Sequence, residues 1–169
     1  MFRAVLLVCA VLALGDAQIT QVSQCSNNIG PLPILTVVEG CRTPPCELPQ
    51  GQDAVISMLF QAPRVIHNMR TVAMAFLSII PFPYDLGNLS ETCNFLVNTY
   101  CPVQEGELIL YTLRLPIEEF LPVGTQLPVE FRILDDDRVA VTCARVVIRI
   151  APPVFNKLGA QNATMSVEV

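Results

Sequence analysis

The sequence contains no tryptophan and one histidine among its 169 residues. That histidine, His67, lies in QAPRVIHNMR, a stretch that predicts a turn between strands, and no Ser/His/Asp arrangement is built around it. Glu118 and Glu119 are adjacent, but neighbours on an extended chain point in opposite directions and make a poor acid–base pair. A glycine-rich phosphate loop and a dinucleotide fingerprint are also missing. We therefore expect no enzymatic activity and no cofactor.

Positive charge is scarce as well. The chain has 10 lysines and arginines against 15 aspartates and glutamates, for a formal net charge of -5, and Lys157 is its single lysine. The arginines are scattered without forming a basic stripe, which argues against a nucleic-acid partner and against strong attraction to an anionic membrane. The acidic run Asp135–Asp137 lacks the spacing and glycine of a calcium loop, so it predicts a hairpin turn.

Long apolar runs are missing beyond the N-terminus. Arg3 precedes the apolar run Ala4–Leu14, and Gly15-Asp16-Ala17 supplies the small residues of a cleavage site, so residues 1–17 predict a secretory signal peptide. The apolar run is too short to span a bilayer, and no later run reaches about 18 residues. We expect a secreted, extracellular protein with one domain over residues 18–150, and nothing in the sequence argues against a monomer.

The cysteines fit this compartment. Cys9 leaves with the signal peptide, and the six that remain predict three disulfides in a secreted chain. Short spacings favour Cys41–Cys46 and Cys93–Cys101, which leaves Cys25 with Cys143. The C-x4-C and C-x7-C spacings fit poorly with structural zinc sites, so we expect no metal.

Two glycosylation sequons are present, at Asn88 and Asn162. Asn88 lies in a turn-rich segment. Asn162 lies in a C-terminal extension, residues 151–169, whose composition differs from that of the domain. Two arrangements of this extension stay open, disorder or folding back through Val154 and Phe155.

Strand signals dominate the domain. Residues 127–133 alternate between apolar and polar side chains, Asp135–Arg138 is a polar turn, and residues 139–150 follow as the second arm of a hairpin. Proline and glycine separate further stretches rich in β-formers: 35–39, 54–60, 68–80 and 107–115. No helical pattern follows the signal peptide. The sequence predicts an all-β protein, an immunoglobulin-like antiparallel β-sandwich of about seven strands.

Two of these stretches, 68–80 and 107–115, are apolar on both faces. One face of a sheet in a single-domain sandwich is normally solvated, so this pattern is unusual. A short covering segment or an oligomer contact accounts for it. A sandwich whose sheets separate around an apolar ligand also accounts for this pattern.

Several stretches together resemble the Niemann-Pick type C2 family of the lipid-recognition ML-domain superfamily. They are CRTPPCELPQGQDAVISMLF with its C-x4-C loop, IIPFPYDLG with its P-F-P turn, CNFLVNTYCPVQ, LRLPIEEFLP, and the closing hairpin LPVEFRILDDDRVAVTCARVVIRI. The resemblance covers about Cys25 to Ile150. It implies a seven-stranded sandwich without enzymatic activity that binds sterols or related lipids between its sheets, in the extracellular space or the lysosomal lumen. It also implies the disulfides Cys25–Cys143, Cys41–Cys46 and Cys93–Cys101.

The resemblance assigns residues to the lipid pocket as well. It places lining residues near the P-F-P turn and the later proline segment: Ala75, Ile80, Phe82, Ile117, Phe120, Leu121 and Pro122. Phe120 stands one position before the expected aromatic, so Phe120 and Leu121 are both candidates for it. The family pattern gives Tyr84 no place in the pocket.

This chain departs from the family pattern after its last cysteine, where Ala144 replaces the frequent tryptophan. A smaller residue there leaves room for a larger cavity, so the ligand stays open among sterols, fatty acids and small hydrophobic signals. Two other functions also stay open: an extracellular immune or adhesion module that docks a protein, and a sensor that presents a lipid to a receptor.

Overall fold

The computed structural model describes residues 19–154, and the signal-peptide prediction, Asn162 and most of the C-terminal extension lie outside them. Eight strands and three short 3-10 turns follow one another in these residues: η1 (Ser26–Asn28), β1 (Leu35–Val38), β2 (Cys46–Pro49), β3 (Asp53–Gln61), β4 (Arg70–Leu77), β5 (Ile80–Tyr84), η2 (Gly87–Ser90), η3 (Thr92–Phe95), β6 (Leu108–Pro116), β7 (Gln126–Leu134) and β8 (Ala140–Ala151). The predicted all-β fold is confirmed.

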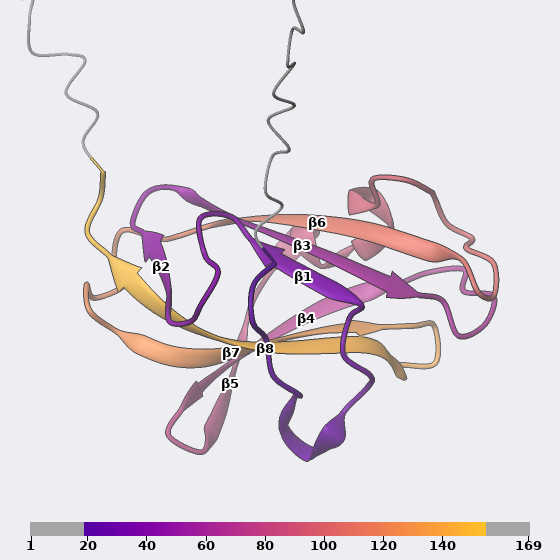
Figure 1. Cartoon of the computed structure of the whole chain (residues 1–169), viewed down its shortest axis with the longest axis horizontal. Helices are drawn as coiled ribbons and strands as arrows, with labels where there is room; N and C mark the ends of the chain where they lie inside the picture. The colour runs from indigo at the N-terminus through magenta and orange to yellow at the C-terminus, as the bar shows by residue number, and fades with distance from the viewer. Residues whose placement is uncertain (1–18, 155–169) are drawn as a thin grey trace, which may run out of the picture.

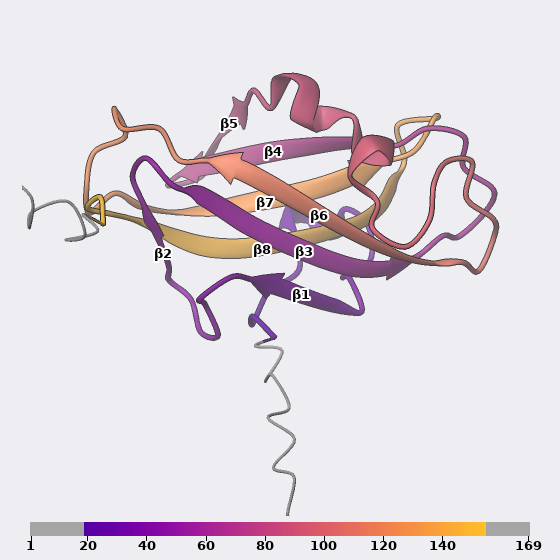
Figure 2. The same cartoon turned by 90° about the horizontal axis from the view of Figure 1, so that it is seen from above.

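Two sheets stack as layers of a sandwich (Figure 1). A three-stranded sheet has the order β1-β3-β6, and a five-stranded sheet has the order β2-β8-β7-β4-β5. Viewed from above, β3 and β6 cross over β7 and β8 (Figure 2). The ladder is antiparallel except at one edge, where β2 pairs with β8 in parallel. The predicted immunoglobulin-like β-sandwich is confirmed, and this edge is its one parallel pairing among the described strands.

The core is built by period-two alternation. On β3, Ala54, Ile56, Met58 and Phe60 are buried while the residues between them are partly exposed. Strand β6 aligns with β3 over its whole length and buries Ile109, Tyr111, Leu113 and Leu115. The inward side chains of the opposing sheet come from alternate positions of β4, β7 and β8.

The predicted strand 68–80 is wrong at its C-terminal end. Strand β4 ends at Leu77, and the chain reverses through Ser78, whose φ is 59°, before β5 begins at Ile80. The P-F-P segment therefore belongs to a strand. Proline is tolerated there because β5 is the edge of its sheet, bonded to β4 alone, and the missing N–H groups cost no ladder bond on the open side.

The two strands that are apolar on both faces differ in what lies against their outer faces. The segment 25–29 lies against the outer face of β4, where Ile29 meets Met74 and Phe76 around one hollow. Along β6, the side chain of Asn98 bonds the backbone N–H and C=O of Leu110 and Leu108. The segment 25–29 therefore covers part of the outer face of β4, whereas the segment at Asn98 bonds the edge of β6 and leaves Leu108 exposed on its outer face.

The three predicted disulfides are confirmed. Cys25–Cys143 joins the N-terminal segment to the middle of β8, Cys41–Cys46 closes the turn before β2, and Cys93–Cys101 closes the loop between β5 and β6. None of them links the two sheets at mid-strand, as the bridge of an immunoglobulin domain does.

Candidate functional site

A cavity lies between the sheets, and each of the eight strands contributes to its wall. Its lining residues are aliphatic or aromatic apart from Thr125, and no polar atom faces the space. The residues are Val38, Leu48, Ile56, Ala73, Ala75, Tyr84, Leu115, Ile117, Leu121, Thr125, Leu127, Val129, Phe131, Val146, Ile148 and Ile150. No charged side chain lines it, so the cavity offers a ligand apolar contact and almost no hydrogen bonding.

The cavity occupies one end of the sandwich because the other end is filled. Tyr111, Met58 and Ile133 are fully buried at the filled end. Towards the other end, β4 presents Ala73 and Ala75, whose side chains are too short to reach across the gap between the sheets. The position of small residues on one strand therefore decides where the space lies.

The free volume of the cavity is about 120 Å³. Pockets that bind drug-sized ligands enclose roughly 300–1,000 Å³. A ligand as large as a sterol therefore requires the sheets to separate or lining side chains to change rotamer. The edge strands β2 and β5 of the five-stranded sheet each pair with a strand on one side only.

The segment 117–121 closes the mouth of the cavity. Backbone bonds between Ile117 and residues 51 and 52, at 2.8 and 2.9 Å, hold it against the turn between β2 and β3. The Gln50 side chain donates to the carbonyl oxygens of Glu119 at 2.9 Å and Leu121 at 2.5 Å. These bonds aim Ile117 and Leu121 inward.

Tyr84 stands at the same mouth, on β5. Burial raises the pKa of its phenol above the ordinary value, and the negative charge of Glu118 raises it further. The phenol is therefore neutral at physiological pH and keeps its proton for donation. Tyr84 is the one tyrosine among the cavity-lining residues, and its ring contributes apolar surface because no polar atom faces the cavity.

Some of the lining residues predicted from the sequence border the cavity, and others do not. Ala75, Ile117 and Leu121 line the cavity, whereas Ile80, Phe82, Phe120 and Pro122 do not. Phe82 pairs with Ala75 and Tyr84 with Ala73, so all four share the inward side of the sheet, but Phe82 lies nearer the hairpin tip and is 45% exposed. Phe120 is 78% exposed.

Sequence reasoning missed Tyr84 and most of the strand positions in the lining. The family pattern gave Tyr84 no role. The alternation within β3, β7 and β8 did contain the signal, because inward positions such as Ile56, Val129 and Val146 follow from period two. Alternation did not predict which of the inward positions border the cavity.

Comparison with known proteins identifies the family. A family model described as ML domain matches residues 20–150. The chain belongs to the ML-domain family. This ML-domain protein is 24% identical over 147 residues to NPC intracellular cholesterol transporter 2 of Mus musculus, covering 87% of this chain and 95% of the mouse protein. It is 23% identical over 126 residues to the protein of the same name from Sus scrofa, covering 75% and 81% of the two chains.

A solved structure has the same fold. The crystal structure of a Niemann-Pick type C2 protein from Japanese carpenter ant superimposes with a TM-score of 0.66 at 18% identity, covering 77% of this chain and 98% of the ant chain. The resemblance to this family that the sequence motifs predicted is therefore confirmed.

Three further site predictions concern metal, membrane and glycan. Within residues 19–154, the one close group of potential metal ligands is Cys25, Glu130 and Cys143, and both sulfurs there are bound in a disulfide. No helix in the same range is long and apolar enough to cross a membrane. Asn88 is exposed on η2.

Proposed function

We propose that this ML-domain protein binds a sterol or another hydrophobic lipid between its two sheets and carries it through an aqueous compartment. The observation that supports this most directly is the uncharged, apolar lining of the cavity, to which every strand contributes. Removing lipid surface from water contributes roughly 25 cal/mol per Å2. The names of the mouse and pig relatives point to the same class of ligand.

We infer a secreted protein, or one of the lysosomal lumen, that loses residues 1–17 and acts without catalysis or cofactor. Three disulfides fit an oxidising compartment. We expect a monomer glycosylated at Asn88 and Asn162, with a membrane lipid-transfer partner or a receptor as the recipient of the lipid.

The residues at the rim keep a role in this proposal. Ile80, Phe82, Phe120 and Pro122 are exposed and flank the mouth on β5 and on the segment after β6. They would contact a ligand as it enters, and Phe82 would stay in contact afterwards because it shares the inward side of the sheet with Ala75. Phe82→Ala should weaken binding and leave the fold intact, and unchanged binding would remove Phe82 from the site.

The proposal is tested by titrating the purified full chain with a fluorescent sterol and a fluorescent fatty acid, together with mass spectrometry of co-purifying lipids. Ala75→Phe fills the cavity and should weaken binding by about tenfold or more, a loss of roughly 1.4 kcal/mol or more. Val97→Phe adds the same side chain at an exposed position outside the cavity and should change nothing. No bound lipid in either experiment would reject the proposal.

A second candidate is a recognition module that docks a protein. The tip of the β4–β5 hairpin favours it, because Leu77, Ile79 and Ile80 are exposed there, Ile79 at 88%. A recognition module of this kind would not admit a lipid between its sheets. Lipid titration would then leave the NMR signals of Val129 and Val146 methyl groups unshifted, whereas a lipid carrier shifts them.

A further inference from the structure

The outer face of the five-stranded sheet, turned away from the cavity, bears a second hollow of about 560 Å³. We call it the outer pocket. Met74, Phe76 and Ile79 of the β4–β5 hairpin form its apolar wall, and Arg132, Arg145 and Ser26 form its polar wall. Met74 pairs with Glu130 across the ladder and Glu130 with Arg145, so these three side chains share the outward face.

Glu130 lies beneath the two arginines and is fully buried. Its Oε2 accepts from Nη2 of Arg132 at 2.5 Å and from Nε at 3.2 Å. Its Oε1 accepts from the backbone N–H of Ser26 at 2.6 Å and from Nη1 of Arg145 at 3.2 Å. Burial alone would raise the pKa of this carboxyl, but the Ser26 N–H and Arg132 hold the pKa below its ordinary value. Glu130 is therefore ionised at neutral pH.

The charges here do not balance. One carboxylate meets two guanidinium groups, so the cluster keeps a surplus of one positive charge, and the pocket lining contains no aspartate or glutamate. The surplus is notable in a chain whose net charge is -5. The Arg132 and Arg145 side chains are 19% and 25% exposed, so a small ligand can reach both.

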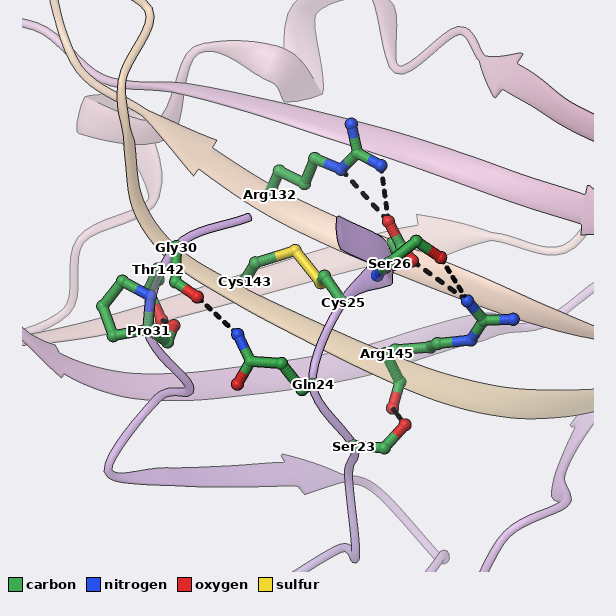
Figure 3. Close-up of a disulfide and its surroundings, with 11 residues drawn as sticks. Ser23, Gln24, Cys25, Ser26, Gly30, Pro31, Arg132, Thr142, Cys143 and Arg145 are labelled. Atoms are coloured by element: carbon green, nitrogen blue, oxygen red, sulfur yellow. Dashed lines mark hydrogen bonds and ion pairs between the residues drawn. A yellow bond between two sulfur atoms is a disulfide. The ribbon is translucent and has the colours of Figure 1, made fainter. Parts of the chain in front are cut away.

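Both guanidinium groups also keep unused donors. Among residues 19–154, no acceptor is bonded to Nη1 of Arg132 or to Nη2 of Arg145. Figure 3 shows Arg132 and Arg145 on either side of Ser26, and only Arg145 bonds the Ser26 hydroxyl. The Arg145 guanidinium carbon lies 4.8 Å from the centroid of the Phe76 ring, and its Nη1 donates to Ser26 Oγ at 2.6 Å, so the group is held in one orientation.

We propose that the outer pocket binds a small amphiphilic anion, a carboxylate on a medium-length alkyl chain, separately from the cavity between the sheets. The carboxylate would accept from the unused N–H groups of Arg145, and Arg132 on the other side of Glu130 would add positive charge. The chain would lie against Met74, Phe76 and Ile79. The cation for the carboxylate and the apolar surface for the alkyl chain lie side by side, because the Phe76 ring lies under the Arg145 guanidinium.

The N-terminal segment completes the site. The Cys25–Cys143 disulfide and a backbone bridge between Ser23 and Arg145 fix this segment to β8, which sets Ser26 against the arginines. The wall of the outer pocket is thus attached to the strand that supplies one of its cations.

The test uses the purified full chain and decanoate as the probe, with isothermal titration and NMR of the arginine side-chain N–H groups. Saturable binding that shifts the Arg132 and Arg145 signals is expected. Arg145→Gln should weaken binding about tenfold, because a hydrogen bond to a charged group is lost while Glu130 keeps Arg132 and the Ser26 N–H. Arg149→Gln, on the same strand but paired with Glu47 and Gln126, changes net charge equally and should bind as the parent does.

Two further variants distinguish the outer pocket from the cavity between the sheets. Met74→Ala shortens the apolar wall of the pocket without adding a charge, and it should also weaken binding. Ala75→Phe fills the cavity, on the opposite face, and should not affect binding. Acetate, which has no chain, and decanol, which has no charge, should each bind at least about tenfold more weakly than decanoate.

Three outcomes would overturn the inference. Equal weakening by Arg149→Gln means unspecific charge attraction. Loss of binding in Ala75→Phe with retention in Arg145→Gln assigns the probe to the cavity, which would support the proposed function and reject the outer site. Acetate binding as tightly as decanoate means that the apolar wall contributes nothing.

Discussion

The hydroxyl of Thr71 on β4 donates a hydrogen bond to the phenol oxygen of Tyr111 on β6 at 2.9 Å, which connects the two sheets through the core. Thr71 in turn accepts from Thr92 at 2.7 Å, and all three residues are buried. Along β4, Thr71 precedes the cavity residues Ala73 and Ala75. This polar contact therefore connects the two sheets beside the residues that line the cavity.

Tyr111→Phe removes that contact and keeps the ring. Thr71 and Thr92 still bond each other, so the free energy of unfolding should fall by only about 1 kcal/mol. Urea unfolding measures the change. Tyr100→Phe, at an exposed tyrosine, is the control and should leave the unfolding midpoint where it is. Equal effects of the two substitutions would show that the inter-sheet contact contributes no stability.

Stability should fall at alkaline pH because of the same residue. Burial raises the pKa of Tyr111 from its ordinary value of 10.0 to about 12, despite the lowering effect of the Thr71 bond. The unfolded chain loses this proton first, so the stabilisation is complete below pH 10 and is lost as the pH rises to about 12. A shift of this size corresponds to roughly 2–3 kcal/mol. The slope of unfolding free energy over this range should be shallower in Tyr111→Phe.

Asp135 organises the turn between β7 and β8. Its Oδ1 accepts from the backbone N–H groups of Asp137 and Val139, both at 2.9 Å, and its Oδ2 accepts from Arg64 at 2.6 Å. Burial alone would raise the pKa of this carboxyl, but the Arg64 and backbone bonds bring the pKa below its ordinary value of 3.8. Its contribution is therefore full above that value and is lost as the pH falls through the lowered pKa.

Asp135→Asn should lower the free energy of unfolding at neutral pH by about 1–3 kcal/mol, because a charged acceptor of several bonds is replaced. It should also flatten the acid limb of the stability curve. Asp137→Asn is the matched control, since Asp137 bonds Arg64 from an exposed position. A larger effect at Asp137 than at Asp135 would contradict this account of the turn.

The disulfides should differ in what their removal costs. Cys25–Cys143 spans a sequence separation of 118 and Cys41–Cys46 one of 5. The chain-entropy estimate gives about 5 kcal/mol for the long loop and about 2 kcal/mol for the short one. Double serine variants of each pair, compared by urea unfolding, should differ in this order. Equal losses would show that the bridges act through local contacts and not through the unfolded chain.

Most of the fold followed from local patterns. The strands with clear alternation, such as 54–60 and the hairpin 127–150, lie where period two predicts them. Two strands did not follow. Strand β2, Cys46–Pro49, has too few residues to show a period and forms only because β8 runs beside it in parallel. Strand β5 contains prolines, which argue against a strand unless it is known to be a sheet edge.

The sequence predicted that a pocket lies between the sheets, but it predicted only some of the residues that line the pocket. Motif order indicated the family and a pocket between sheets, and Ala75, Ile117 and Leu121 do line one. Whether Phe82 or Tyr84 borders the cavity depends on how far β5 extends past the opposing sheet, which no local pattern records. The outer pocket depends on Glu130, Arg132 and Arg145, which two strands bring together with the N-terminal segment.

The sequence by itself determined most of the strands, though not β2 and β5, together with the cysteine pairing and the family, because alternation and short spacings act between neighbours in the chain. Only the tertiary structure decided where the space lies and where charge is left over. Empty volume depends on which side chains meet across the sheets, as the short Ala73 and Ala75 do at one end and Thr71 and Tyr111 do at the other. Surplus charge depends on how many cations surround a buried carboxylate, and the two arginines at Glu130 belong to different strands.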